Sequence, residues 1–273
     1  MKRNHKMKKY ARITASLVAV SLASCFYRPS PEELRLQAYL KTPIVENSHQ
    51  SMAVISECDI AEMPSQNEKM YFTHGPFEEQ IDEQAPFLKA RRLRDLDYCA
   101  AIDNVHTPAE ATAYIQQNMT HGGDMADGEC YGNVDYWASF KIMHESRFKD
   151  AEGRIIDDCD GGALAAAALL QDNGYPPVFI MMNNEENESH VVFAYRTPEG
   201  YGSLGMRNSD INPPCSKSIT DLVRTIGTRS KHYFTSYRLY DMSKIFPDFA
   251  ENDKNNDLLP FPIMNPAAPF GGY

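Results

Sequence analysis

The sequence has little that would build a metal centre. Its six cysteines include no Cys-x-x-Cys pair, and no His-Glu-x-x-His motif occurs. Zinc ligands usually come in these spacings, so we expect neither a metal nor an organic cofactor. The acidic stretch at residues 183–188 predicts a solvated loop, with calcium capture as its alternative use. Internal repeats are absent as well.

Acidic residues are missing from the first 24 positions, which carry six lysines and arginines. An apolar run from Ile13 to Leu22 follows and is too short for a membrane-spanning helix. A basic segment, a short apolar segment and small residues in this order predict a secretory signal. The sequence Leu-Ala-Ser-Cys at 22–25 resembles a bacterial lipobox, which implies that residues 1–24 are removed and that Cys25 is lipidated. The alternative is an ordinary signal peptide cut nearby, with Cys25 incidental.

The resemblance to a lipoprotein implies a place in the cell envelope. Acyl chains on Cys25 would hold the protein at a membrane, and Phe26 stands where an aspartate would indicate retention in the inner membrane. In a cell with two membranes, we expect an outer-membrane anchor with the domain facing the periplasm. Removal of residues 1–24 would leave 21 basic and 37 acidic residues, a net charge of −16. Such a charge repels phosphate backbones, so we expect no nucleic-acid partner.

The cysteines divide by expected role. Cys25 is assigned to lipid and Cys159, as argued below, to chemistry, which leaves an even number. In an oxidising compartment the remaining four are compatible with two disulfides, and three pairings are possible. The alternative is that some are small buried residues. These four are Cys58, Cys99, Cys130 and Cys215.

Composition divides the mature chain into three parts. Residues 25–50 are polar and punctuated by proline, with a short helical patch expected near 31–40, and they predict a tether. Residues 51–248 have enough length and apolar content for one domain with a full core. The acidic and then proline- and glycine-rich residues 249–273 predict an irregular tail.

Helices are expected first in the domain and antiparallel strands afterwards, which predicts an α+β fold. One clear helix signal is Thr-Pro-Ala-Glu from residue 107, a capping box with proline at the first helical position. Another helix begins at Cys159 and is apolar on most sides, as expected at the centre of a domain. Helices are expected at 107–119, 134–148, 159–174 and 219–226, and strands at 177–182, 190–196 and 201–208.

Cys159 lies where a reactive thiol is expected. It falls at the first turn of a buried helix, where the helix dipole lowers a thiol pKa by stabilising the thiolate. Asp157, Asp158 and Asp160 act in the opposite direction, unless they turn away and cap free amides. The glycine pair at 161–162 is costly at a helix start and indicates that another segment approaches closely. The alternative for Cys159 is a small residue chosen for packing.

His190 opens a strand-like run and is the expected base, since a thiol needs a partner base at neutral pH. The hairpin that follows predicts which residue would bind the His190 ring. Thr-Pro-Glu-Gly at 197–200 favours a three-residue loop with a bulge, and that register places Asn208 opposite His190. Asp210, two residues further on the same face, is the reserve candidate. A two-residue loop would place Arg207 opposite instead.

The residues around Cys159 and His190 resemble those of the bacterial transglutaminase-like cysteine proteinase superfamily. The resemblance rests on Asp-Cys-Asp-Gly-Gly-Ala-Leu from residue 158, Asn-Gly-Tyr-Pro from 173 and Ser-His-Val-Val from 189, and covers about residues 105–240. It implies a transglutaminase-like, papain-like fold, with a central helix packed against an antiparallel sheet. It also implies a Cys159 nucleophile and a His190 base. The family's usual acid would fall near 204–205, where this chain has none, and Asn208 is the nearest suitable group.

An oxyanion donor is the remaining part of such a site. The backbone N–H of Cys159 is one natural donor, and Asn133 and Tyr136 lie in a segment where such folds often supply another. Core packing is the expected role of Trp137. Three other histidines show no ligand spacing: His106, His121 and His144.

The leading expectation is a membrane-anchored thiol enzyme that cleaves or transfers at amide bonds of a peptide or protein. Cys159 would attack the carbonyl and His190 would shuttle the proton. The alternative is a catalytically impaired scaffold that binds a peptide or a cell-envelope partner. A third possibility is a cell-wall endopeptidase of the Asp-Cys-Ser-Gly type, which the Asp160-Gly161 step fits less well.

Overall fold

The computed structural model describes residues 30–46, 54–55, 93–123, 137–146, 149–186, 188–244 and 253. The chain separates into two units, residues 1–42 and 43–273. The predicted signal peptide at 1–24, Cys25, and most of the expected tail at 249–273 lie outside the described residues. No described helix is both long and apolar enough to cross a membrane.

The first unit contributes one described helix, α2 (Pro31–Tyr39). The Ser30 hydroxyl accepts the N–H of Glu33, and the Glu33 carboxylate accepts the N–H of Ser30. This reciprocal pair is a capping box, which satisfies amides that the first helical turn leaves without partners. The helical patch expected near residues 31–40 is therefore confirmed.

The second unit is built on a seven-stranded sheet in the order β1-β9-β5-β6-β7-β8, with β2 also paired to β9. Only the β1–β9 pair is parallel among these described strands. A separate parallel pair joins β3 (Met119–His121) to β4 (Ile155–Asp157). The other strands are β1 (Val45–Glu46), β2 (Val54–Ile55), β5 (Val178–Asn183), β6 (Ser189–Thr197), β7 (Gly200–Leu204), β8 (Asn212–Ser216) and β9 (Ser236–Asp241).

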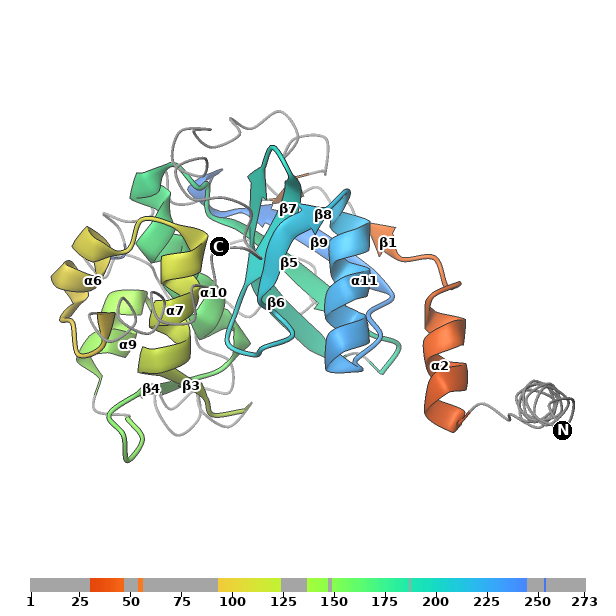
Figure 1. The fold of residues 1–273 in the computed structure, drawn as a ribbon, viewed down its shortest axis with the longest axis horizontal. Coiled ribbons are helices and arrows are strands. Elements are labelled where there is room, and N and C mark those ends of the chain that lie inside the picture. Colours follow the sequence, from red (N-terminus) through yellow and green to blue (C-terminus); the bar gives the residue numbers. More distant parts are fainter. Residues whose placement is uncertain are drawn as a thin grey trace, which may run out of the picture. The chain divides into compact units, whose positions relative to one another are not determined.

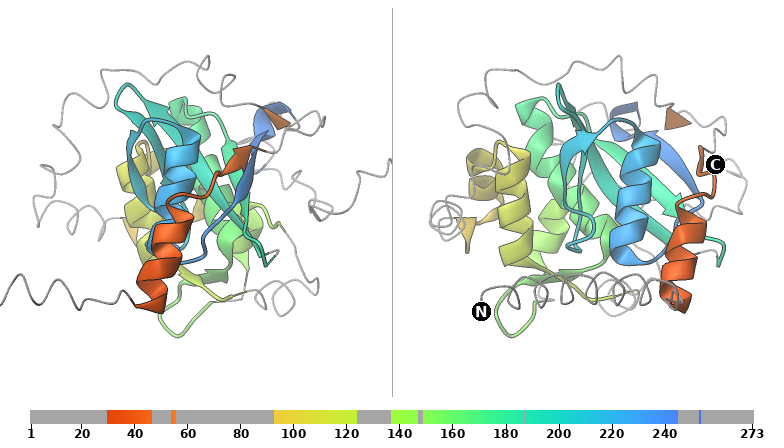
Figure 2. Two further views of the ribbon diagram at one scale, coloured as in Figure 1. Left: turned by 90° about the vertical axis from the view of Figure 1, so that its right-hand side faces the viewer. Right: turned by 45° about the vertical axis from the view of Figure 1, so that its right-hand side comes forward.

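Helices cover both faces of this sheet (Figures 1 and 2), so the fold is α+β as predicted. One face carries α10 (Cys159–Leu170), with further helices packed around it, and the other carries α11 (Ile219–Ser230). Side chains of β5 alternate between the two cores, as the period of a strand requires. The helices around α10 are α6 (Tyr98–Asn104), α7 (Pro108–Asn118) and α9 (Phe140–Glu145).

The central helix α10 is buried along nearly its whole length. All eleven residues after Cys159 are buried, seven of them alanines and leucines within residues 164–170. A short 3-10 turn follows and ends at Gly174, whose φ of 80° suits glycine and stops the helix. The expected helix at 159–174 is confirmed, and the capping box of α7 at Thr107 and Glu110 is present.

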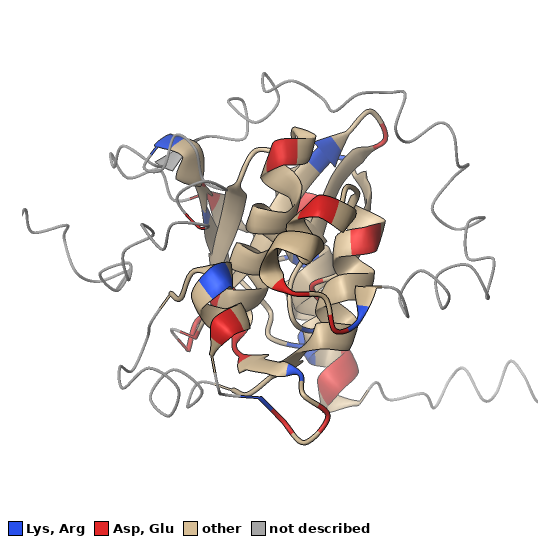
Figure 3. Cartoon of the chain, turned by 90° about the vertical axis from the view of Figure 1, so that its left-hand side faces the viewer, with Lys and Arg blue, Asp and Glu red and all other residues tan. Residues whose placement is uncertain are grey.

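Acidic residues recur over the helices on the α6 side of this unit, with basic residues between them (Figure 3). This distribution agrees with a chain of 37 acidic and 27 basic residues.

Several expectations were wrong in their bounds. The helix expected at 134–148 begins only at Phe140, because Ser139 caps it by accepting the N–H of Ile142. The strand expected at 201–208 ends at Leu204. The hairpin has a two-residue loop, with Thr197 paired to Gly200 and Arg196 to Tyr201. The predicted three-residue register is therefore shifted by one.

The predicted pair of disulfides is not formed. Cys99 and Cys215 are exposed free thiols, and each of the three pairings that join all four cysteines needs both of them. Cys58 and Cys130 lie outside the described residues.

Candidate active site

Cys159 is the first residue of α10, and β4 leads into it. Asp158 is the N-cap residue, and its carboxylate accepts the N–H of Asp160 at 3.2 Å. The Asp157 carboxylate accepts the N–H of Asp158 at 2.9 Å. Both carboxylates therefore bind free amides at the helix start, as expected for acids in this position.

Gly162 allows the loop after β7 to approach the start of α10. A Cβ atom at this position would lie 2.8 Å from the backbone nitrogen of Met206, closer than carbon and nitrogen can pack. The same loop carries Asp210, and a Cβ on Gly205 would lie 2.8 Å from the Cβ of Asp210. The close approach expected from the glycine pair at 161–162 is confirmed.

The Cys159 thiol is half-buried and free, and its environment opposes ionisation. Burial raises the pKa of this thiol well above its usual value, and the charges of Asp158 and Asp160 raise it further. The backbone N–H of Val191 lies near enough to the sulfur to lower the pKa, but its effect is smaller. The pKa of the thiol is therefore raised overall, and the raising effect expected of Asp158 and Asp160 is confirmed.

His190 is held rigidly in β6. Its ring is 4% exposed and stacks on Phe234, with centroids 5.9 Å apart and planes within 7°. Its Nε2 atom lies 2.8 Å from Oδ1 of Asp210. Because Asp210 accepts the proton on Nε2, the lone pair of the neutral ring is on Nδ1.

Asp210 is fully buried, and its side chain has three hydrogen-bond partners. Besides the His190 ring, the N–H of Arg207 donates to Oδ2 at 2.9 Å and the Ser209 hydroxyl to Oδ1 at 3.2 Å. Its backbone carbonyl accepts the Ser203 hydroxyl. Burial alone would raise the pKa of Asp210, but the His190 hydrogen bond and the neighbouring charges lower it overall. The carboxylate is therefore ionised at neutral pH.

Asn208 does not reach His190. Its side-chain oxygen instead accepts a long hydrogen bond of 3.4 Å from Gln116 on α7. Asp210, the reserve candidate, binds the His190 ring in place of Asn208. The reason is the end of β7: the last pair in the ladder is Phe193 with Leu204, so the residues that follow are not held in strand register. Asp210 reaches the imidazole from a loop.

The Cys159 sulfur lies close to the backbone N–H of Val191, the residue that follows His190 in β6. The paired part of β7 begins opposite Phe193, two residues further along β6. The described residues include no hydrogen bond between the sulfur and the His190 ring. Catalytic hydrogen bonds are often looser before a substrate binds.

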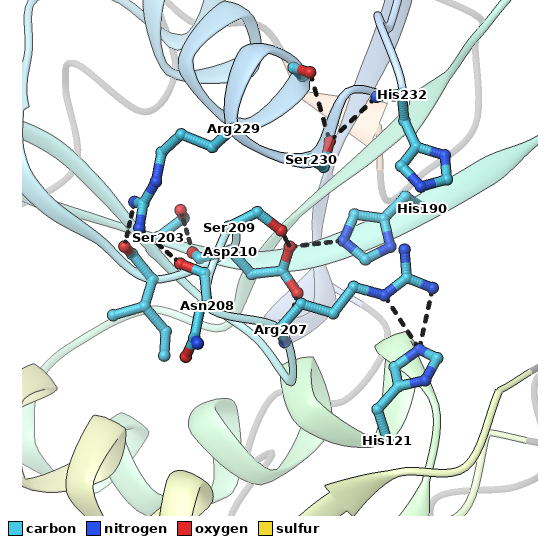
Figure 4. A network of polar contacts seen from close by, with 12 residues as sticks. His121, His190, Ser203, Arg207, Asn208, Ser209, Asp210, Arg229, Ser230 and His232 are labelled. Atoms are coloured by element: carbon cyan, nitrogen blue, oxygen red, sulfur yellow. Dashed lines mark hydrogen bonds and ion pairs between the residues drawn. The ribbon is translucent and has the colours of Figure 1, made fainter.

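The role of His121 was missed from the sequence, and Arg207 was considered only as the residue that a two-residue loop would place opposite His190. His121 on β3 pairs with Asp157 on β4, and the charges of Asp158, His190 and Asp210 all affect its pKa. The Arg207 guanidinium binds its Nε2 atom (Figure 4). In the sequence, His121 is an isolated histidine with no local pattern around it. The long-range pairing of β3 with β4 places it beside Asp157, two residues before Cys159.

The other sequence candidates lie away from this chemistry. Trp137 is buried against Phe179, in agreement with core packing. His106 binds the Asn173 side chain and His144 binds the Tyr114 hydroxyl. Asn133 and Tyr136, the expected oxyanion donors, lie outside the described residues.

Three carboxylates at the start of α10 have the oxygen chemistry that hard cations prefer. Ligand atoms of Asp157, Asp158 and Asp160 lie within 4.8 Å of one another. Two of them cap amides of the chain, as described above, and this role accounts for their position without an ion.

No protein-family model matches the chain, and no curated protein matches its sequence.

Proposed function

We propose that this protein is a thiol enzyme of the transglutaminase-like, papain-like type that acts on amide bonds. The observation that supports this most is the buried hydrogen bond between His190 Nε2 and Asp210 Oδ1, beside a free thiol at a helix start. The pattern of a nucleophile, a base and a third group that orients the base is the general arrangement for covalent catalysis. Asp210 replaces Asn208 as the third member.

The proposed reaction balances without a cofactor. The Cys159 sulfur attacks the carbonyl carbon of an amide while its proton passes to Nδ1 of His190. The C–N bond then breaks, and the amine leaves with that proton. Water or a second amine attacks the thioester, and its proton returns through His190 to the sulfur. Through both steps, the Asp210 carboxylate stabilises the imidazolium.

The anchoring predicted from residues 22–25 would place this enzyme at the cell envelope, with peptide or protein amides as substrates. Hydrolysis and acyl transfer share the same first half-reaction, so one experiment tests both. The purified protein is incubated with a mixture of peptide chloromethyl ketones, which alkylate a thiol irreversibly, and the adduct is located by mass spectrometry. We expect modification at Cys159 that Asp210→Asn slows. Equal labelling of Cys99, Cys159 and Cys215, unaffected by Asp210, would contradict the proposal.

A second candidate function is a scaffold that keeps the fold but binds its partner without reaction. The raised pKa of the Cys159 thiol favours it, because a protonated thiol is a weak nucleophile. Capture of binding partners on immobilised wild-type protein and on immobilised Cys159→Ala distinguishes the scaffold from the enzyme. A partner held equally by both proteins supports the scaffold, whereas a partner released or cleaved only by the wild type supports the enzyme.

A further inference from the structure

Arg207 is a charged side chain at the candidate site that the proposed reaction does not use. It belongs to the same loop as Asp210, and its backbone N–H binds that carboxylate. Its guanidinium reaches His121, with Nε and Nη2 at 3.1 and 3.0 Å from Nε2 of the imidazole. Figure 4 draws the guanidinium between the rings of His121 and His190.

His121 cannot accept all the hydrogen bonds that this guanidinium can donate, and it cannot balance its charge. Its Nδ1 atom already accepts the N–H of Gly123 at 3.0 Å, so both ring nitrogens face donors. Burial lowers the pKa of His121, and the Arg207 charge lowers it further, so the ring is neutral at pH 7 and offers only one lone pair. Among the described residues, no carboxylate lies within ion-pair distance of Arg207. The guanidinium therefore retains donors and a charge for a ligand.

The position of Arg207 indicates which part of a substrate it would meet. The Arg207 guanidinium lies between the rings of His121 and His190 (Figure 4) and binds the first of them. Both His121 and Arg207 are half-buried, at a place that solvent reaches. In the proposed reaction, His190 delivers its proton to the departing amine. A guanidinium beside His190 would therefore meet the part of the substrate that departs with this proton.

We propose that Arg207 binds a carboxylate carried by the leaving group, an inference that rests on the proposed function. The planar guanidinium matches a carboxylate with two parallel hydrogen bonds, and lysine does not. The charges of Asp158 and Asp210 also act at this place, and they would repel a doubly charged phosphate more strongly than a carboxylate. The substrate class is thus a peptide with an acidic side chain directly after the bond, or with its own terminal carboxylate there.

The test begins with the wild-type protein and a mixture of proteolytic peptides, whose cleaved or transferred bonds are identified by mass spectrometry. Cys159→Ala is the blank. One reactive sequence is then made as two pairs. In the first pair, Glu or Gln follows the bond and the peptide ends in an amide. In the second pair, the peptide ends one neutral residue after the bond, as a free carboxylate or as an amide.

We expect wild-type kcat/KM to favour the carboxylate member of one pair by about tenfold or more, the order of one charge-assisted pair. The responding pair identifies the source of the carboxylate. Arg207→Gln should abolish the preference but keep activity on the amide member, and Arg207→Lys should retain part of it. Lys217→Gln, which removes an exposed cation outside the site, should change nothing.

Equal wild-type rates within both pairs would overturn the inference and leave the proposed function standing. A preference that survives in Arg207→Gln would overturn it too. The wild-type comparison remains decisive even if that variant fails to fold. Absence of any Cys159-dependent reaction on the peptide mixture would overturn the proposed function, and this inference with it.

Discussion

The imidazole of His190 binds the carboxylate of Asp210 at 2.8 Å, although the two residues lie on different segments 20 positions apart. The contact fixes the ring in two ways. It sets the tautomer, because Nε2 must carry the proton, and it supplies a negative charge for the imidazolium that the proposed reaction would form. Stacking on Phe234 prevents the ring from turning. A carboxamide at Asn208 would have supplied the orientation without the charge.

Replacing Asp210 should therefore cost activity, whereas replacing Asn208 should not. In Asp210→Asn, the amide oxygen still accepts the Nε2 proton, but the charge is lost, and we expect turnover to fall by about 10²- to 10⁴-fold. Asn208→Ala removes only the long contact to Gln116, so we expect a change within about twofold. Steady-state rates on a reactive peptide, with circular dichroism to check folding, measure both. The opposite ranking would return Asn208 to the site.

The charge of Asp158 should suppress the reactivity of Cys159. Asp158→Asn keeps an N-cap side chain and removes one of the charges that raise the thiol pKa. We expect the thiol pKa to fall and the rate of alkylation by iodoacetamide at pH 7 to rise about three- to tenfold. Asp103→Asn, an exposed change on α6, is the matched control. An unchanged pH profile of alkylation in Asp158→Asn would show that the charge of Asp158 does not affect the thiol pKa.

Local signals in the sequence predicted most of the fold. The capping box at Thr107, the stop at Gly174 and the apolar run in α10 each act within a few residues, and each is where it was expected. The two core strands, β5 and β6, differ from their expected ranges by one residue at either end. Burial patterns of this kind are dictated by the period of the element itself.

The parts of the site that could not be predicted depend on distant segments. The hairpin register was set by the turn at 197–200, where two loop lengths fit the sequence and the structure adopts the shorter one. His121 comes to the site through pairing of β3 with β4, which no local pattern encodes. The sign of the Cys159 pKa shift depends on burial, and burial is a property of the folded chain.

Arg229 should position the loop that carries Asp210. This exposed side chain on α11 donates from Nη1 to the Ile211 carbonyl at 2.7 Å and to Asn212 Oδ1 at 2.6 Å, and from Nη2 to the Asn208 carbonyl at 2.7 Å. It therefore holds both sides of Asp210 without touching the reacting atoms.

Arg229→Ala should lower kcat by about tenfold with little change in KM, because the substrate still binds but Asp210 is held less firmly. We expect a fall in Tm of only about 2–4 °C and faster amide hydrogen exchange confined to residues 207–212. Arg229→Lys, which cannot form the same fork, should restore little. Normal exchange in that loop together with reduced kcat would contradict a positioning role.

Asp253 should make the stability of the domain depend on pH. This fully buried carboxylate accepts the Tyr98 hydroxyl at 2.7 Å and the N–H of Phe140 at 2.6 Å, so it joins the starts of α6 and α9. Burial raises its pKa to about 6, although these hydrogen bonds act in the opposite direction. The folded protein thus holds a proton that the unfolded chain releases near pH 4.

Since the folded state binds more protons between pH 4 and 6, this group's contribution to stability falls as the pH rises through that range, by about 3 kcal/mol in total. Asp253→Asn keeps an oxygen for the Phe140 amide and cannot ionise, so it should lack this dependence. Urea unfolding of both proteins at pH 4, 5, 6 and 7 gives the difference directly, and Asp103→Asn controls for an exposed carboxylate. Parallel curves for wild type and Asp253→Asn would mean that the carboxylate titrates in the folded protein as it does in the unfolded chain.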